Sequence, residues 1–370
     1  MLSIPTWKDK VLFTPGPLTT APTVKQAMLR DLGSRDFAFI EAVRDIRRRL
    51  LAVGEVASPE YETILMQGSG TFSVEAVFSS TVARDGKVLI IVNGAYGKRM
   101  VQMCKVLGIA TVVLEFAEDQ WPDLAQIEAA LKAGDITDVA TVHCETTTGI
   151  VNPIEAIGAL AKQYGARYFV DAMSSFGAVP LNVAAAHIDY IVSSANKCIE
   201  GVPGFGFVIA RREALLETEG RARSLSLDIL SQWKGLEKDG QFRFTPPTHA
   251  LLAFHQALLE LEREGGAAGR AARYRANYAT LVNGMRALGF TEYLPAEKQG
   301  YIITSFRYPQ HAKWDFEAFY KALNERGYVI YPGKVSNADC FRIGNIGRIF
   351  ESDVQDLLGA IAAVKAAMGF

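Results

Sequence analysis

The stretch YFVDAMSSFGAVPLNVAAAHIDYIVSSANKC, residues 168–198, constrains the fold more than any other part of the sequence. Two apolar runs in it, Tyr168–Val170 and Tyr190–Ala195, predict strands that are buried on both faces, as parallel strands are. Asp171 directly follows the first strand, and Lys197 follows the second. Open α/β sheets bind ligands at the carboxyl ends of their strands. We therefore expect Asp171 and Lys197 to lie in one ligand site.

The pair of Asp171 and Lys197 has two interpretations. One is an ordinary salt bridge, which would serve the fold alone. The other is a site for pyridoxal phosphate (PLP), because that cofactor needs a lysine amine for its Schiff base and a carboxylate beside its pyridine nitrogen. We adopt the PLP site as the working hypothesis, with Lys197 and Asp171 as its catalytic residues.

The composition excludes several classes of protein. A chain of 370 residues, 49% of them hydrophobic, is sufficient for about two globular domains. A net charge of −1 offers no basic surface for nucleic acid, and the basic run Arg44–Arg49 is expected to be a solvated helix face. Four widely spaced cysteines predict reduced thiols and no metal site. Without a signal-peptide pattern or an apolar run of about 18 residues, we expect a cytoplasmic protein with no membrane partner.

Predicted helices and strands alternate along the first two thirds of the chain. This alternation predicts right-handed βαβ crossovers and an α/β fold with a mostly parallel central sheet flanked by helices. The last strand, Phe205–Ala210, is expected to be antiparallel. The other expected elements are strands ending at Gln67 and covering Lys87–Asn93 and Thr111–Phe116, and helices over Phe37–Leu51, Leu124–Leu131, Ile154–Tyr164 and Thr248–Arg263.

Gly265 and Gly266 mark a predicted domain boundary. Beyond it, a strand at Tyr301–Phe306 and helices at Phe316–Glu325 and Val354–Met368 predict a smaller α+β unit. We therefore predict an N-terminal arm over residues 1–15, a large cofactor-binding domain over 16–264 and a small C-terminal domain over 265–370.

A glycine-rich turn lies between the strand that ends at Gln67 and a helix expected from about Phe72. Its residues Gly68-Ser69-Gly70-Thr71 predict an anion cradle, because glycine lets the backbone approach a ligand, while helix N-terminal amides and hydroxyls donate to it. A helix-capping turn without a ligand is an equal alternative. The dinucleotide fingerprint is not met, since Ser73 stands where it requires a third glycine.

Two further strand ends carry aromatic or polar side chains. In GAYGKR, Tyr96 is expected in a glycine-flanked loop, where it could stack on a flat cofactor ring or only pack over the strand end. His143 and Glu145, in VATVHCETTTGIVNP, could be metal ligands or an acid and base. Since their spacing supplies no further ligand, we favour a polar loop whose hydrogen bonds are satisfied.

Arg342 is the charged residue in the otherwise apolar run Cys340–Ile343. Such an arginine either pairs with an internal carboxylate or forms a bidentate clamp for a carboxylate or phosphonate ligand. Both interpretations stay open at this point.

Ten sequence islands resemble, in the same order, one known family. They are TPGPLTT, LMQGSGTF, VNGAYGKRM, VHCETTTGIVNPI, VDAMSSFG, SSANKCIEGVPGF, RSLSLD, FTPPTHA, YPGKVS and CFRIGNIG. With them the chain resembles the fold-type I PLP enzymes, in particular the class-V small-molecule aminotransferases that include alanine–glyoxylate and serine–pyruvate transaminases. The resemblance spans nearly the whole chain and implies a fold-type I PLP-transferase fold.

The resemblance implies roles around the cofactor ring. Lys197 would form the Schiff base, with Asn196 beside it, and Asp171 would hold the pyridine nitrogen. Tyr96 would stack on the ring, and Thr146 would bond near the ring hydroxyl.

It also implies contacts to the acidic groups. Ser69, Gly70 and Thr71 would hold the cofactor phosphate. Thr245 would reach the phosphate of the neighbouring subunit, which implies a homodimer with shared active sites. Arg342 would bind the acidic group of the substrate, and Arg35 is a candidate second contact.

The implied activity is PLP-dependent transamination between a small amine and a 2-oxo acid. The islands agree best with members that take the amino group from a small phosphonate and give it to pyruvate, in phosphonate catabolism. The alternative within the family is an alanine–glyoxylate, serine–glyoxylate or serine–pyruvate aminotransferase. A non-catalytic α/β protein that binds an anion at the Gly68–Thr71 turn is a rival from another class.

Overall fold

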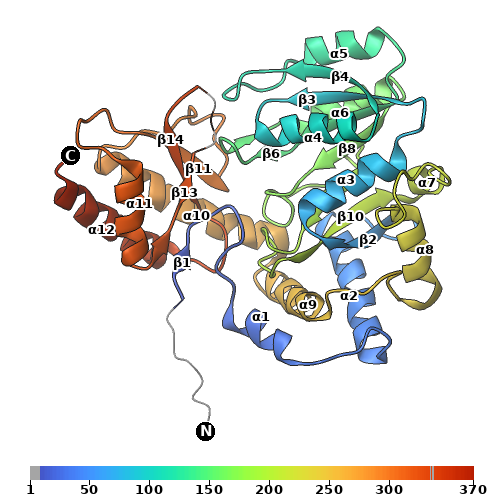
Figure 1. Cartoon of the computed structure of the whole chain (residues 1–370), viewed down its shortest axis with the longest axis horizontal. Coiled ribbons are helices and arrows are strands. Elements are labelled where there is room, and N and C mark those ends of the chain that lie inside the picture. The colour runs from blue at the N-terminus through green and yellow to red at the C-terminus, as the bar shows by residue number, and fades with distance from the viewer. Residues whose placement is uncertain (1–8, 334, 336) are drawn as a thin grey trace.

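A seven-stranded sheet forms the centre of the computed structural model, which describes residues 9–333, 335 and 337–370 (Figure 1). Neighbouring strands are parallel except in the two pairs that include β10, which is antiparallel to both neighbours. This arrangement confirms the predicted α/β class and the antiparallel strand. The strand order is β2 (Tyr61–Gly68), β10 (Gly204–Arg211), β9 (Tyr190–Ser194), β8 (Arg167–Asp171), β5 (Asp138–Val142), β3 (Lys87–Val92) and β4 (Ala110–Glu115).

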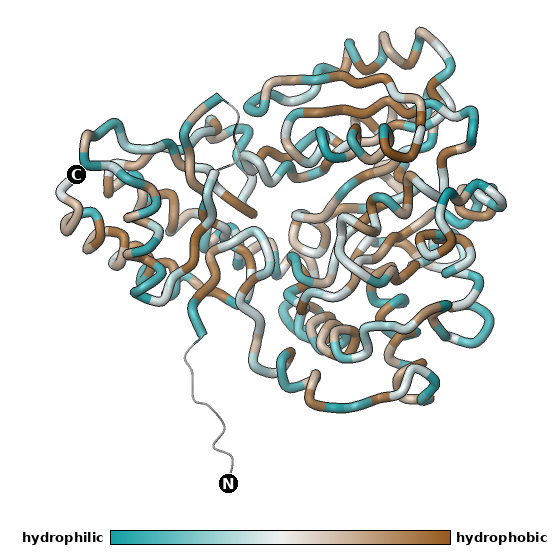
Figure 2. Tube along the Cα trace, in the orientation of Figure 1, coloured by the Kyte–Doolittle hydropathy of each residue, from teal (hydrophilic) through white to brown (hydrophobic). Residues whose placement is uncertain are grey.

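Helices cover both faces of this sheet because its central strands are apolar on both faces. In β3, Leu89 and Ile91 pack into one hydrophobic cluster, whereas Val88, Ile90 and Val92 pack into the other. Figure 2 shows hydrophobic residues along the interior strands of the sheet. The first cluster includes residues of α2 (Phe37–Val53), α5 (Leu124–Lys132), α6 (Ile154–Gln163) and α9 (Thr248–Arg263). The second includes residues of α3 (Gly70–Thr81), α4 (Ala95–Val106), α7 (Arg212–Leu216) and α8 (Ile229–Asp239).

The local sequence explains where two of these helices begin. The Asp36 carboxylate caps α2 by accepting a hydrogen bond from the backbone N of Ala38 at 2.8 Å, as short acidic side chains do at the N-cap. Helix α3 begins at Gly70 rather than near Phe72. The glycine-rich turn therefore includes the first helical turn, and the backbone amides at this helix end lie in the predicted cradle.

A second, antiparallel sheet lies beside the first (Figure 1). It contains β11 (Ile303–Arg307), β14 (Cys340–Gly344) and β13 (Tyr331–Pro332). The core beneath it is aromatic: the ring centroid of Phe341 lies 5.6 Å from that of Phe290 and 5.8 Å from that of Phe306. Helices α10 (Gly266–Ala287), α11 (Phe316–Glu325) and α12 (Glu351–Met368) pack around this core.

Helix α10 is a 22-residue helix that the sequence pattern did not predict. Its first half, GAAGRAARYRA, consists of alanine, glycine and arginine with one tyrosine. Three of its buried positions, Arg270, Tyr274 and Asn277, are polar, and the buried apolar residues Leu281, Val282 and Met285 are confined to its second half. The first half of the helix therefore shows no hydrophobic periodicity.

The N-terminal segment binds the C-terminal part of the chain before it joins the large sheet. Strand β1 (Val11–Leu12) pairs in parallel with β12 (Tyr328–Val329). The backbone N of Gly344 donates to the carbonyl of Phe13 at 3.0 Å, and the backbone N of Arg348 donates to that of Thr19 at 2.7 Å. Helix α1 (Pro22–Gln26) and a short 3-10 turn (Ala27–Leu29) follow. The first eight residues of the predicted arm lie outside the described residues, and the predicted domain boundaries stay predictions.

Cys104, Cys144, Cys198 and Cys340 are all buried and form no disulfide. Across residues 9–333, 335 and 337–370, no helix has both the length and the apolar character needed to cross a membrane.

Candidate active site

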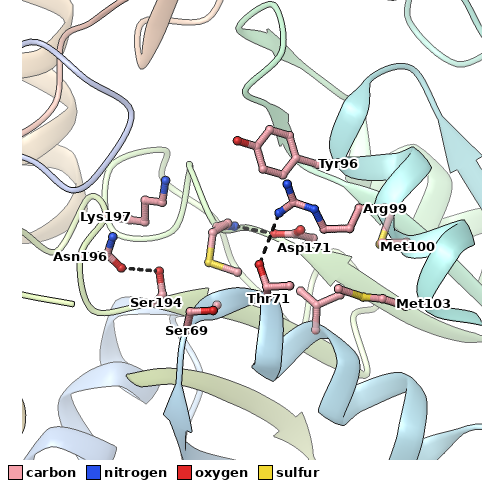
Figure 3. A pocket seen from close by; sticks show the side chains of 13 residues that line it. Ser69, Thr71, Tyr96, Arg99, Met100, Met103, Asp171, Ser194, Asn196 and Lys197 are labelled. Carbon is pink, nitrogen blue, oxygen red and sulfur yellow. Dashed lines mark hydrogen bonds between the residues drawn. The ribbon is translucent and has the colours of Figure 1, made fainter. Parts of the chain in front are cut away.

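A cavity of about 180 Å³ lies at the carboxyl ends of β8 and β9, beside the start of α3 (Figure 3). Seven of the predicted site residues line it: Ser69, Gly70, Thr71, Tyr96, Asp171, Asn196 and Lys197. The structure thus brings together residues from four separate sequence motifs. The other described residues in its lining are Val74, Arg99, Met100, Met103, Met173 and Ser194.

Asp171 is the last residue of β8 and is buried. Its Oδ1 accepts a hydrogen bond from the backbone N of Met173 at 2.9 Å. Burial raises the pKa of its carboxyl to about 6, although the Met173 amide and the charges of Lys197 and Arg99 act in the opposite direction. Because Asp171 is buried, its interaction with a cation in the cavity would be weakened little by solvent.

Lys197 lies in the turn after β9, on the opposite side of the cavity from Asp171 (Figure 3). Its Nζ donates a hydrogen bond to the backbone carbonyl of Pro15. Burial lowers the pKa of its amine to about 8. The two side chains do not form the ordinary salt bridge that was the alternative interpretation, since the ion pairs among the described residues do not include them.

Gly16 brings the N-terminal segment directly onto Lys197. A Cβ atom at this position would lie 2.7 Å from the carbonyl oxygen of Asn196 and 2.8 Å from Cδ of Lys197. Its φ of +107° is also a conformation that favours glycine. The TPGP loop can therefore cover the lysine only with glycine at this position.

The start of α3 has the geometry of an anion cradle. Ser69 is the N-cap residue, with φ −113° and ψ 172°, but its side chain makes no capping hydrogen bond. A Cβ atom on Gly70 would lie 2.2 Å from Sδ of Met173, so a larger residue here would displace the Met173 side chain. The Ser69 side chain therefore does not cap the helix, and helix N-terminal amides such as these can bind an anion.

Tyr96 lies in the first turn of α4, so its expected place in a loop was wrong. The reason is the buried carboxylate of Glu145, which occupies the N-terminus of this helix. Its Oε2 accepts from the backbone N of Tyr96 at 3.3 Å and of Gly97 at 3.4 Å, and its Oε1 accepts from Oγ1 of Thr147 at 2.7 Å. An anion at a helix N-terminus stabilises the first turn.

The polar loop after β5 is a short hairpin of β6 (Cys144–Glu145) and β7 (Ile150–Val151). Glu145 is hydrogen-bonded as expected. His143 is not: its Nδ1 is buried and has no hydrogen-bond partner in the described part of the chain. Burial lowers the pKa of His143 to about 4, so its ring is neutral at physiological pH.

Arg342 and Thr146 connect the two sheets. Arg342 lies in β14 and is 1% exposed. Its Nη1 donates to the carbonyl of Thr146 at 2.8 Å, and its Nε donates to the carbonyl of Pro332 at 2.9 Å. Oγ1 of Thr146 shares a hydrogen bond of 3.0 Å with Oγ of Ser174. Arg342 also forms a side-chain hydrogen bond with Tyr96. The ion pairs between described residues do not include Arg342, which does not match the alternative of pairing with an internal carboxylate.

Four predicted site residues are not part of the cavity lining: Arg342 and Thr146, which connect the two sheets, and the exposed Thr245 and Arg35. Thr245 is exposed, on the loop before α9, where the carbonyl of the adjacent Phe244 accepts from Nε2 of Gln67 at 2.9 Å. Arg35 is exposed, next to the Asp36 cap of α2. Neither residue is among those that line the cavity around Lys197.

Arg99 is a cavity residue that sequence reasoning missed. Its Nη1 donates to Oγ1 of Thr71 at 3.3 Å, and its guanidinium carbon lies 4.9 Å from the centre of the Tyr96 ring. Both Tyr96 and Arg99 lie on α4. Residues three apart share one face of a helix, so recognising the helix would have placed Arg99 beside Tyr96.

The aminotransferase class-V family model matches residues 23–342 of this chain. The chain therefore belongs to the class-V aminotransferase family. Among its curated relatives are 2-aminoethylphosphonate–pyruvate transaminases from Salmonella schwarzengrund (strain CVM19633) and Salmonella typhimurium. They are 53% and 52% identical to it over 359 residues, which cover 96% of this chain and 98% of each relative.

Solved structures share the fold over nearly the whole chain. The alanine–glyoxylate aminotransferase from Nostoc sp. is similar with a TM-score of 0.90 and 27% identity, covering 98% of this chain and 97% of that one. The pyridoxamine–pyruvate aminotransferase from Mesorhizobium loti is similar with a TM-score of 0.89 and 25% identity, covering 99% and 95%. The expected family and fold type are confirmed.

Proposed function

We propose that this enzyme transfers the amino group of 2-aminoethylphosphonate to pyruvate with PLP as cofactor, giving phosphonoacetaldehyde and L-alanine. The observation that carries this proposal is the cavity that holds Lys197 and Asp171 on opposite sides, with an anion cradle at the start of α3. The names of relatives that are 52–53% identical over 96% of the chain support the choice of substrates.

The residues of the cavity fit PLP. The Ser69 hydroxyl makes no capping bond, and Ser69, Gly70 and Thr71 line the cavity at the start of α3, where helix amides and hydroxyls can bind the phosphate. Lys197 would hold the cofactor covalently, Asp171 would pair with the pyridine nitrogen, and Tyr96 would stack on the ring. When bound, PLP supplies an electron sink for the carbon that carries the amine.

Lys197 acts as the proton carrier of the reaction. Its amine is free for this role once the amine of the substrate has displaced it from the cofactor. Burial lowers the pKa of the free amine to about 8, so part of it is neutral near physiological pH and can accept a proton from the amine-bearing carbon of the substrate, which it would then deliver to the cofactor. The carbonyl of Pro15 holds Nζ near the cavity. Asp171, buried and without competing solvent, stabilises a positive charge on the pyridine nitrogen.

Arg342 binds the acidic group of each substrate in turn. Its guanidinium is buried, and its planar set of donors matches a phosphonate or a carboxylate. One cation thus serves the phosphonate donor in one half-reaction and the carboxylate of pyruvate in the other. Arg35 is proposed as a second contact to the phosphonate, and its exposed position means that this contact requires the neighbouring subunit.

The proposed assembly is a cytoplasmic homodimer with shared active sites. Thr245 is exposed on a loop rather than in the cavity of its own chain, which supports a role across the dimer interface. In that arrangement its hydroxyl donates to the phosphate of the cofactor in the neighbouring subunit.

A second candidate is the transamination of alanine or serine with glyoxylate or pyruvate. The similarity to the Nostoc sp. alanine–glyoxylate aminotransferase favours it, with 27% identity and a TM-score of 0.90. Both candidates use the same lysine chemistry and differ in the acidic group that Arg342 receives.

A panel of amino donors and acceptors distinguishes the two candidates. We expect kcat/KM for 2-aminoethylphosphonate with pyruvate to exceed that for alanine or serine with glyoxylate. If alanine with glyoxylate is faster by about tenfold, roughly 1.4 kcal/mol in the opposite direction, the phosphonate assignment fails and only the aminotransferase class remains.

A further inference from the structure

Among the described residues that line the cavity, the cations are Arg99 and Lys197. The proposed function, on which this inference rests, commits Lys197 to the covalent bond with the cofactor and leaves Arg99 as the remaining positive side chain. Arg99 belongs to α4, and Figure 3 shows its guanidinium between Tyr96 and Thr71. The proposed reaction assigns no role to Arg99.

The surroundings of Arg99 are unfavourable for an isolated cation. Its Nη1 contacts Oγ1 of Thr71, the second residue of α3, at 3.3 Å. The N-terminus of a helix carries a partial positive charge, so a guanidinium there is repelled unless an anion lies between the two. The carboxylate in the cavity lining, Asp171, is committed by the proposed function to the pyridine nitrogen.

Arg99 is nevertheless held in this position. Its guanidinium carbon lies 4.9 Å from the centre of the Tyr96 ring, a cation–π distance. Its neighbour Lys98 points elsewhere and forms an ion pair with Glu115 at 3.0 Å. The geometry therefore directs one cation of α4 toward the cradle of α3.

We propose that Arg99 is the cationic member of the phosphate cradle and donates a charge-assisted hydrogen bond to the phosphate of PLP, together with the hydroxyls of Ser69 and Thr71. A phosphate monoester carries close to two negative charges near neutral pH. The helix amides and hydroxyls of the cradle are neutral donors, whereas hydrogen bonds from arginine to phosphate are stronger and geometrically specific. Arg99 balances the negative charge of the phosphate that these neutral donors do not compensate.

The test compares two ligands that differ in the phosphate alone. The full-length protein, freed of cofactor, is titrated with PLP and with pyridoxal, and binding is followed by absorbance. For Arg99→Gln we expect the Kd for PLP to rise on the order of 10- to 100-fold, the usual effect of losing a charged hydrogen bond. The Kd for pyridoxal should change less than about threefold, since it carries no phosphate.

Two further variants control this experiment. Lys98→Gln removes a neighbouring positive charge that is half exposed and should leave both affinities unchanged. Arg99→Lys keeps the charge but loses the planar fork, so it should weaken PLP binding less than Arg99→Gln and still spare pyridoxal. If Arg99→Gln does not fold, the same comparison of PLP with pyridoxal is made with Arg99→Lys.

Inorganic phosphate gives a second measurement that does not depend on activity. It should compete with PLP at the wild-type cradle and compete less at the cradle of Arg99→Gln. If Arg99→Gln weakened the binding of PLP and of pyridoxal equally, or did not weaken the binding of PLP, the role assigned to Arg99 would be wrong. The proposed function would not be affected by that result. Failure of the wild-type protein to bind PLP would overturn the proposed function, and this inference with it.

Discussion

Lys197 and Pro15 are joined by a hydrogen bond from Nζ to the backbone carbonyl, although 182 positions separate them in the sequence. The same N-terminal segment pairs with β12 and bonds to Gly344 and Arg348. The segment therefore links the lysine of the large sheet to the strands that carry Arg342. We infer that it fixes the distance between the lysine and Arg342, the arginine proposed to bind the substrate.

Gly16→Ala tests this link. A methyl group at this position would lie 2.8 Å from Cδ of Lys197 and 3.0 Å from its Nζ, so the lysine must move. We expect kcat to fall by about tenfold or more, because small displacements of a reacting group are costly to the rate. Gly220→Ala is the matched control: it has a similar positive φ of +78° but no atom within 4 Å of a Cβ. Equal effects of the two variants on kcat would attribute the loss to backbone strain rather than to Lys197.

Asp171→Asn separates the function of this residue from its effect on stability. In the active enzyme, a neutral amide cannot hold the pyridine nitrogen protonated, so we expect turnover to fall on the order of a hundredfold or more while PLP still binds. Activity near that of the wild type would contradict the role as partner of the ring nitrogen.

The same substitution should stabilise the cofactor-free protein. Burial raises the pKa of Asp171 in the folded state to about 6, above the ordinary value of 3.8 in the unfolded chain, so the folded state binds more protons between these values. Stability is therefore lost as the pH rises through this window. At pH 7.5 we expect Asp171→Asn to unfold at higher temperature than the wild type, by an amount equivalent to about 2–3 kcal/mol, and near pH 4 the difference should vanish. A loss of stability at pH 7.5 would favour the salt-bridge interpretation.

Arg342→Lys should weaken both half-reactions. Lysine keeps a positive charge but cannot supply the planar pair of donors, nor both carbonyl contacts to Thr146 and Pro332. We expect kcat/KM to fall on the order of tenfold or more for 2-aminoethylphosphonate and for pyruvate alike in single-turnover experiments. A loss confined to one of the two substrates would show that they bind to different cations.

A mixing experiment tests the proposed shared site. A Lys197→Ala chain lacks the lysine but keeps Thr245, and a Thr245→Val chain has the opposite defect. If the dimer shares its sites, refolding the two together should restore one complete site per heterodimer, and roughly a quarter of all sites at random pairing. Active monomers, or no gain of activity on mixing, would contradict the shared site.

The sequence predicted the parts of the site that follow from local pattern. Asp171 and Lys197 stand after apolar runs, and such runs become buried strands whose ends meet at one edge of the sheet. The glycine-rich turn at Gly70 was recognisable as part of the cavity from its glycines, although the helix begins earlier than expected. These features depend on neighbours within a few residues.

Other parts depend on contacts between distant residues and could not be predicted. The start of α4 is fixed by Glu145, almost 50 positions away, so Tyr96 and Arg99 were not recognised as one helix face. Helix α10 buries Arg270 and Tyr274, which bond to the carbonyl of Cys198 and to Glu200, and it therefore has little apolar periodicity. The contact between Pro15 and Lys197 is made by the backbone carbonyl of Pro15, and a backbone group leaves no signal in the sequence.

The most direct test of the central claim is the location of the cofactor on the chain. The purified protein is incubated with PLP, reduced with borohydride, digested and analysed by mass spectrometry, with Lys197→Ala as the control. We predict a single phosphopyridoxyl adduct on Lys197, loss of the yellow colour on reduction, and neither adduct nor turnover in a Lys197→Ala protein that unfolds as cooperatively as the wild type. An adduct on another lysine, or turnover by the Lys197→Ala protein, would contradict the account.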